Sequence, residues 1–234
     1  MMRSWLNRSR LNLGIKRKIL KHPVVNEIVG SFLAPNRLKL PEVGLVRLIG
    51  GTADVVSMLM VPMNEWDTPY NDLVPLSALA KSVRPQRILE VGTCRGQATL
   101  QLAANCPDAR IITYDIDEKA GVYFSDHPIR QRIELRIADF AADRNQLLIE
   151  GPFDFIFIDA LHSFEAVISH SELSIELLGE RGMIVWHDYS HRGSEWLLSE
   201  NGVPEALWQL SQKRPIYSIR GTALAVLSKA PLRG

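Results

Sequence analysis

From Arg87 to the C-terminus, short apolar runs alternate with segments of helical spacing, and this alternation constrains the fold more than any other feature of the chain. The predicted strands are Arg87–Val91, Arg110–Tyr114, Ile133–Ile137, Phe153–Ile158 and Met183–Trp186, and the predicted helices are Gln97–Ala104, Phe164–Leu178 and Pro204–Ser211. Repeated strand–helix units produce a parallel sheet with right-handed crossovers. The almost continuously apolar run Phe153–Ile158 is typical of a central parallel strand, which is buried on both faces.

Two further strands are predicted at the end of the chain. Ile216–Ile219 and Ala223–Leu227 flank Arg220 and Gly221, which is a hairpin signal. This hairpin is expected to add an antiparallel strand to the sheet. The sequence therefore predicts an α/β, Rossmann-like fold: a seven-stranded, mostly parallel sheet with an antiparallel terminal strand and helices on both faces.

Residues 1–64 lack this alternation. Their apolar stretches are interrupted by Pro23, Pro35 and Pro41, so they are predicted to form a basic, irregular and helical N-terminal extension to a domain over 65–234. No acidic residue precedes Glu27, although the net charge of the whole chain is only +1. The basic residues of this arm are Arg3, Arg8, Arg10, Lys16, Arg17, Lys18 and Lys21. The arm is expected to be a solvated tail. Two alternatives stay open: the arm contacts an anionic membrane surface, or the N-terminal segment forms a homodimer interface.

The sequence also indicates a location. No run approaches the roughly 18 consecutive apolar residues of a membrane span, and the basic arm lacks the apolar core of a signal peptide. The two cysteines, Cys94 and Cys106, do not form a disulfide framework. The cytoplasm is therefore the expected compartment.

The first predicted strand ends in a glycine-containing turn, Glu90-Val91-Gly92-Thr93-Cys94-Arg95-Gly96. In an open parallel sheet, ligands bind outside the carboxyl ends of the strands. Gly92 and Gly96 allow a tight turn and a close approach of a ligand to the backbone. The turn is not the GxGxxG of dinucleotide-binding proteins. A carboxylate at Glu90 suits the ammonium of an amino acid better than a pyrophosphate.

The next four strands also end in acidic or histidine residues: Asp115-Ile116-Asp117, Asp139-Phe140, Asp159 with His162, and His187-Asp188. Asp115 follows the first glycine at the distance of a carboxylate that binds ribose hydroxyls. Asp139 and Phe140 suit an exocyclic amine and a purine face. For Asp117 and Asp139, capping of the following helix is the alternative interpretation.

These motifs together resemble the class I S-adenosylmethionine-dependent methyltransferases, and within that class the small-molecule group called methyltransferase family 24. The resemblance rests on Glu90 to Gly96, Phe157 to Phe164, Gly182 to Tyr189 and Gly221 to Ala225, and it covers roughly residues 62–228. It implies that Glu90, Gly92, Thr93 and Gly96 surround the methionine part of the cofactor. It also implies that Asp115 binds the ribose, that Asp139 with Phe140 binds the adenine, and that Ile116 and Asp159 lie beside the cofactor.

The resemblance implies methyl transfer to a small-molecule hydroxyl. His162 is the leading candidate for the base, and His187 is a weaker one, because an imidazole titrates near neutral pH. Asp159 and Asp188, at the ends of neighbouring strands, suit Mg²⁺ or another divalent metal. Leu161 and His170 depart from the acidic residues that are common in relatives, and these departures concern the catalytic residues rather than the cofactor site.

Other interpretations stay open at this level. A nicotinamide-dependent oxidoreductase is disfavoured by Glu90 and by the missing GxGxxG, and a protein that binds the cofactor without turnover is the second alternative. No nucleic acid partner is expected, because the predicted strand ends are acidic. Trp66, Tyr70 and Asn71 are candidates for a lid. The acceptor itself has no recognisable signature.

Overall fold

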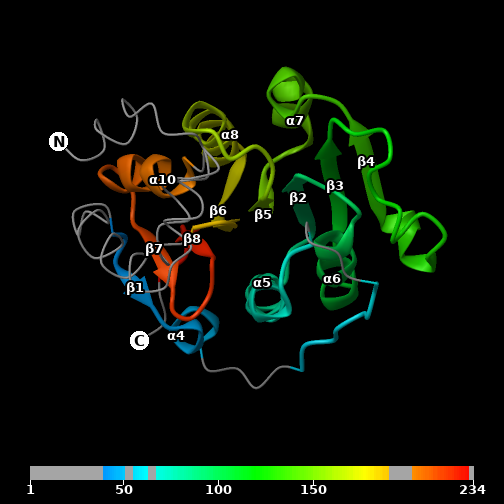
Figure 1. Cartoon of the computed structure of the whole chain (residues 1–234), viewed down its shortest axis with the longest axis horizontal. Helices are drawn as coiled ribbons and strands as arrows, with labels where there is room; N and C mark the ends of the chain where they lie inside the picture. Colours follow the sequence, from blue (N-terminus) through cyan, green and yellow to red (C-terminus); the bar gives the residue numbers. More distant parts are fainter. Residues whose placement is uncertain (1–38, 51–54, 63–66, 190–201, 232–234) are drawn as a thin grey trace, which may run out of the picture.

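The protein is built around one mixed β-sheet (Figure 1). The computed structural model describes residues 39–50, 55–62, 67–189 and 202–231. Its strands are β1 (Glu42–Val43), β2 (Arg87–Val91), β3 (Arg110–Asp115), β4 (Ile133–Ile137), β5 (Phe153–Ile158), β6 (Leu178–Trp186), β7 (Ile216–Ile219) and β8 (Ala225–Ser228). They lie in the order β1-β7-β8-β6-β5-β2-β3-β4. Only β8 pairs in antiparallel fashion, with β6 on one side and β7 on the other.

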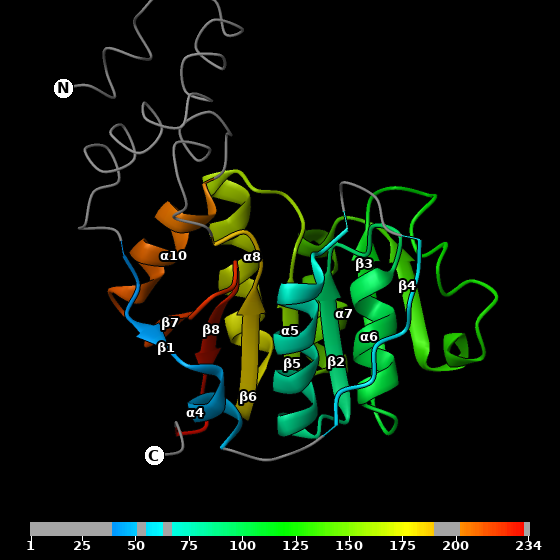
Figure 2. The same ribbon diagram turned by 60° about the horizontal axis from the view of Figure 1, so that its bottom comes forward.

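Helices cover both faces of this sheet (Figures 1 and 2). They are α4 (Leu45–Ile49), α5 (Tyr70–Val83), α6 (Gln97–Asn105), α7 (Arg144–Glu150), α8 (Phe164–Leu177) and α10 (Val203–Ser211), with the 3₁₀ helices η2 (Pro128–Arg132) and η3 (Phe140–Asp143). Buried side chains of α4, α5 and α6 form one core with the sheet, and those of α7, α8 and α10 form a second core on the opposite face. The Rossmann-like α/β prediction is confirmed.

The described residues contain eight strands in the sheet, one more than expected. The additional strand β1 belongs to the N-terminal segment and pairs in parallel with β7, through Glu42 with Ser218 and Val43 with Ile219. Strand β6 also begins at Leu178, before the predicted Met183. Its first half contains Gly179, Glu180 and Arg181, which hide the apolar pattern of a strand, and a register irregularity separates this half from the rest of its pairing with β5.

Within the predicted N-terminal extension, residues 55–62 contain neither helix nor strand, and the basic residues of the arm lie outside the described residues. No described helix has the length and apolarity needed to cross a bilayer.

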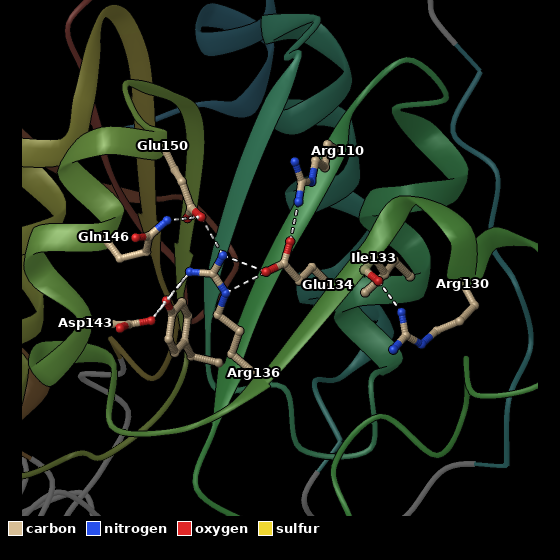
Figure 3. Close-up of polar contacts among 9 residues, drawn as sticks. Arg110, Arg130, Ile133, Glu134, Arg136, Asp143, Gln146 and Glu150 are labelled. Carbon is tan, nitrogen blue, oxygen red and sulfur yellow. Dashed lines mark hydrogen bonds and ion pairs between the residues drawn. The ribbon is translucent and has the colours of Figure 1, made fainter.

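An ionic network joins the edge strand β4 to α7 (Figure 3). The Arg136 guanidinium donates to Glu134 Oε1 at 2.6 Å and to Glu150 Oε1 at 2.7 Å. It also donates to the Tyr114 hydroxyl at 2.7 Å, and that hydroxyl donates to Asp143 Oδ2 at 2.6 Å. The Tyr114 ring in turn lies edge-on to Phe140, with the ring centroids 5.6 Å apart. The network therefore fixes an aromatic pair at the carboxyl ends of β3 and β4.

Candidate active site

The turn between β2 and α6 contacts the end of β5 so closely that it requires glycine. Gly92 has a φ of +100°, and a Cβ atom there would lie 1.9 Å from the carbonyl oxygen of Asp159. Gly96 has a φ of +88°, and its Cβ would lie 2.5 Å from the Phe124 ring. A side chain at either position would collide with its neighbour and strain the backbone. Gly92 thus brings the turn directly against Asp159, and Gly96 brings it against Phe124.

Glu90 lies beneath this turn rather than in the cavity above it. Its side chain is fully buried, and Oε2 accepts hydrogen bonds from the hydroxyls of Thr99 (2.5 Å) and Thr113 (2.6 Å). Oε1 is buried and has no partner among the described residues. Burial raises the pKa of Glu90 from its ordinary value of 4.5 to about 8, against the opposing effect of the two threonine hydrogen bonds.

Asp115 connects the turn to the end of β3. Its Oδ2 accepts the Cys94 N–H at 2.7 Å and its Oδ1 accepts the Asp117 N–H at 2.9 Å. Asp139 caps the 3₁₀ helix η3, as the alternative interpretation expects, by accepting the Ala141 N–H at 3.0 Å. Asp117 accepts the Lys119 N–H at 2.9 Å, but turns rather than a helix follow it, so the expected helix cap at Asp117 is wrong.

A cavity of about 500 Å³ lies over the ends of β3 and β4. The predicted residues that line it are Asp115, Ile116, Asp139, Phe140 and Asp159, and α8 contributes Ser169 and His170. The ring of His170 lies edge-on to Phe140 at 5.6 Å, and its Nδ1 is buried without a described partner. Burial lowers the pKa of His170, so the imidazole is neutral at neutral pH.

A second cavity of about 620 Å³ lies over the ends of β5 and β6. Thr93, Asp159, His162, His187 and Asp188 line it among the predicted residues, and so do Asp67, Thr68 and Asp72, which the sequence did not indicate. The two cavities share Gly92, Cys94, Asp159 and Ala160 in their walls. They therefore adjoin at the contact between the β2–α6 turn and the end of β5.

The four predicted catalytic and metal-binding residues come together in the second cavity. His162 Nε2 lies 2.9 Å from Asp188 Oδ2 and 3.9 Å from Asp159 Oδ1. His187 Nδ1 lies 3.3 Å from Asp159 Oδ1 and 3.5 Å from Asp188 Oδ1. Thr68 donates its hydroxyl to Asp159 Oδ2 at 3.2 Å.

The carboxylates of this cluster favour the charged form of both imidazoles. The hydrogen bonds to Asp159 and Asp188 raise the pKa of His162 to about 9. The pKa of His187 is raised well above its ordinary value, because its neighbouring carboxylates outweigh the opposing effect of burial. Burial alone would raise the pKa of Asp159, but the neighbouring His187 and His162 hold the pKa of that carboxyl below its ordinary value. Both imidazoles therefore carry a proton at neutral pH in the ligand-free protein.

Ligand atoms of Asp159, His162 and Asp188 all lie within 4.8 Å of one another. Two carboxylates and one imidazole are a suitable donor set for a divalent metal, and the imidazole favours a softer ion than Mg²⁺. The predicted pair Asp159 and Asp188 thus fits a metal, and His162 lies within the same cluster.

Two buried residues that the sequence did not indicate complete this cavity. Asp72 lies in the first turn of α5, with Oδ2 3.3 Å from His187 Nε2 and Oδ1 accepting the Ala223 N–H at 2.9 Å. Gln97 begins α6 and is only 3% exposed, and neither atom of its amide has a partner among the described residues. Of the proposed lid, Tyr70 packs against the core beneath α5, Asn71 contacts Asp72, and Trp66 lies outside the described residues.

Comparison with known proteins agrees with this site. Residues 89–189 match a family model described as a methyltransferase domain. The chain is 31% identical over 137 residues to a catechol O-methyltransferase from Mycobacterium tuberculosis, covering 56% of this chain and 60% of that protein. It is 30% identical over 139 residues to a caffeoyl-CoA O-methyltransferase from Stellaria longipes, covering 56% of each. The chain thus matches less than two thirds of the length of either curated relative.

The structure resembles that of an O-methyltransferase from Bacillus cereus in complex with S-adenosylhomocysteine. The TM-score is 0.58 at 18% identity, and the similarity covers 88% of this chain and 97% of that one. Sheet order and site together define the fold of the class I methyltransferases. The segment 89–189, which contains the turn and the acidic strand ends, is the part of the chain that matches the methyltransferase-domain model.

Proposed function

We propose that this protein transfers the methyl group of S-adenosylmethionine to a hydroxyl of a small molecule. The observation that supports this most directly is the pair of adjoining cavities, because a methyl donor must occupy one and a methyl acceptor the other at a shared boundary. The names of the two curated relatives, both O-methyltransferases, support the same reaction. Methyl transfer from a sulfonium needs mainly in-line positioning and exclusion of water, which adjoining cavities provide.

The donor's adenosine part suits the cavity over β3 and β4. Asp115 would bind the ribose hydroxyls, and Ile116 and Phe140 would contact the faces of the adenine. Asp139 uses one carboxylate oxygen to accept the Ala141 N–H, and its other oxygen would accept a hydrogen bond from the adenine. The amino-acid part would then lie at Gly92, Thr93 and Gly96. There the amide of Gln97 offers both a donor and an acceptor, so a carboxylate and an ammonium would supply its missing partners.

The acceptor side contains the acidic and imidazole groups. We assign proton removal to the neutral form of His162, which a metal on Asp159 and Asp188 would favour by engaging the two carboxylates that otherwise hold its proton. The side chain of His162 is 46% exposed and reaches the cavity, whereas that of His187 is 9% exposed and engages carboxylates at both ring nitrogens. His187 is then a group that orients Asp159. Asp159 and Asp188 would hold a divalent metal, which when bound would stabilise an ionised acceptor hydroxyl.

Calorimetric titration with S-adenosylhomocysteine and, separately, with NAD tests the cofactor. Binding of S-adenosylhomocysteine is expected, and binding of NAD alone would overturn the proposal in favour of an oxidoreductase. Turnover is tested with S-adenosylmethionine and a panel of small hydroxyl compounds that includes catechol. Binding without transfer to any acceptor would favour a cofactor-binding protein. A cytoplasmic location is part of the proposal, and both cysteines are free in the structure.

A further inference from the structure

An extended segment, residues 55–62, runs beside α6 and is called the strap here (Figure 2). Met58, Leu59 and Val61 of the strap pack against the core between the sheet and α5–α6, whereas Met60 is 77% exposed. The strap contributes no strand to the sheet. Backbone N–H and C=O groups of an extended segment still need partners, and here α6 supplies them.

Two amide side chains of α6 bind the strap's backbone at alternate residues. Gln101 accepts the Leu59 N–H and donates to the Leu59 carbonyl, both at 2.8 Å. Asn105 accepts the Ser57 N–H and donates to the Ser57 carbonyl, also at 2.8 Å. Gln101 and Asn105 are buried, and each uses its amide in the way a neighbouring β-strand would use its backbone. We call this pair the amide clamp.

The geometry of the clamp follows from the two kinds of secondary structure. Residues four apart on a helix are separated by a rise of about 6 Å. Residues two apart on an extended chain are separated by about 6.6 Å, so the two spacings nearly coincide. The pairing of Asn105 with Ser57 and of Gln101 with Leu59 means that the strap runs antiparallel to α6. It therefore runs toward the β2–α6 turn, where α6 begins.

The C-terminal end of the strap, at Pro62, lies near the wall of the 620 Å³ cavity proposed for the acceptor. The Tyr123 hydroxyl donates to the Pro62 carbonyl and lies 3.3 Å from Asp67 Oδ2. The Tyr123 N–H donates to the Arg95 carbonyl of the turn at 2.9 Å. Asp67 and Thr68 line the 620 Å³ cavity, and Thr68 contacts Asp159. The strap backbone from Leu59 to Pro62 and the hydrogen bonds of Tyr123 thus connect the clamp to the wall of the acceptor cavity.

We propose that Gln101 and Asn105 are positioning residues for the acceptor wall at Asp67 and Thr68, acting through the strap. This inference rests on the proposed function for its effect on catalysis, whereas the clamp itself does not depend on a substrate. Releasing the strap would leave two buried amides without partners, a penalty that keeps it docked. The wall beside Asp159 is held in place as a consequence.

The first test compares hydrogen exchange in wild type and in the double variant Gln101→Met/Asn105→Leu. The variant keeps the side-chain shapes approximately and removes the four bonds to the strap, together with the bond from Asn105 to the Gln101 carbonyl. Exchange at the Ser57 and Leu59 amides is expected to accelerate by at least about tenfold. The Asp72 and Leu73 amides, which donate to the Pro69 carbonyl beside the wall, are expected to accelerate as well. Faster exchange confined to Ser57 and Leu59, or no change at either pair, would overturn the proposal.

A milder pair of variants guards against misfolding of the double variant. Ser57→Pro removes one N–H of the strap, whereas Ser57→Ala keeps it, so only the first should reproduce the change in exchange at Asp72 and Leu73. Met60→Ala, on the exposed side of the strap, should behave as wild type. Equal behaviour of Ser57→Pro and Ser57→Ala at Asp72 and Leu73 would contradict a role of the clamp.

The second test uses catechol and S-adenosylmethionine as the probe pair. Loss of the clamp is expected to raise the KM for catechol by about fivefold, while kcat and the Kd of S-adenosylhomocysteine change less than twofold. A fall in kcat or in cofactor affinity with unchanged KM would overturn the positioning role. Failure of the wild type to bind S-adenosylhomocysteine would instead reject the proposed function. The hydrogen-exchange experiment needs no substrate, so it tests the role of the clamp even if the proposed function is rejected.

Discussion

Asp72, in the first turn of α5, lies with Oδ2 3.3 Å from Nε2 of His187 at the end of β6, although 115 positions separate them in the sequence. Both side chains are nearly buried, and Asp72 also accepts the Ala223 N–H at 2.9 Å. This contact orients His187 from the side opposite Asp159 and joins α5, β6 and the segment before β8. The acidic cluster at the acceptor cavity is therefore supported by a residue outside the matched segment 89–189.

Asp72→Ala is expected to destabilise the fold and to reduce turnover. The change leaves Nε2 of the buried His187 without its carboxylate partner, and breaking a buried ion pair costs up to about 3–5 kcal/mol. Urea denaturation measures the loss, and Asp108→Ala, at an exposed position, is the matched control. A free energy of unfolding within 0.5 kcal/mol of wild type, on the order of a typical surface change, would contradict the role given to Asp72.

Glu90→Gln is expected to flatten the pH dependence of stability between pH 5 and 7. The pKa of Glu90 is about 8 in the folded protein and its ordinary value is 4.5. Within that window the unfolded chain has released the proton and the folded protein retains it, so stability falls as pH rises, by at most about 1.4 kcal/mol per pH unit. Glutamine stays neutral and removes this contribution.

Urea midpoints at pH 5, 6 and 7 check this in the absence of cofactor. Because His162 and His187 titrate in both proteins, the difference between wild type and variant isolates Glu90. Parallel pH profiles would mean that Glu90 is ionised in the folded protein across this range.

Gln97→Met is expected to have opposite effects on stability and on cofactor binding. The buried amide has no partner in the described residues, so its removal should leave the ligand-free fold as stable as wild type or more stable. The same change should weaken the binding of S-adenosylhomocysteine by about tenfold, since a hydrogen bond to a charged group contributes about 1.5 kcal/mol or more. Thermal unfolding and calorimetry measure the two effects, with the exposed Gln212→Met as control. Unchanged affinity would show that Gln97 does not contact the cofactor.

Chelation is expected to abolish or strongly reduce methyl transfer, and added Mg²⁺ or Mn²⁺ to restore it. Asp188→Asn should raise the metal concentration needed for half-maximal activity, because one of two carboxylate ligands is lost from the cluster of Asp159, His162 and Asp188. Turnover is measured against metal concentration after treatment with EDTA. Full activity in EDTA would show that methyl transfer does not require a metal at this cluster.

Arg136→Met is expected to destabilise the fold by about 2 kcal/mol, since it breaks charged hydrogen bonds to Glu134 and Glu150 in a side chain that is only 15% exposed. Arg144→Met is the control, because its pair with Glu176 is exposed on both sides and should contribute under about 1 kcal/mol. S-adenosylhomocysteine binding should weaken in the first variant only, because Tyr114 and Phe140 lose their support. Equal losses of stability in both variants would contradict the network's importance.

The sequence by itself determined the alternation of strands and helices and the polar residues at the strand ends. These are local properties: β2, β4, β5 and β7 have the predicted bounds because a short apolar run specifies a buried strand without reference to distant residues. Asp159, His162, His187 and Asp188 came together as expected, since parallel strands place their carboxyl ends at one edge of the sheet.

Only the tertiary structure decided what depends on contacts between distant segments. It buried Glu90 beneath the turn, placed Asp72 against His187, left Gln97 without partners at the cavity, and bound the strap to Gln101 and Asn105. A carboxylate or an amide has the same local signature whether it caps a helix, pairs with a histidine or binds another segment's backbone. Packing selects among these partners, because each buried polar group must find one within hydrogen-bonding distance in the folded chain.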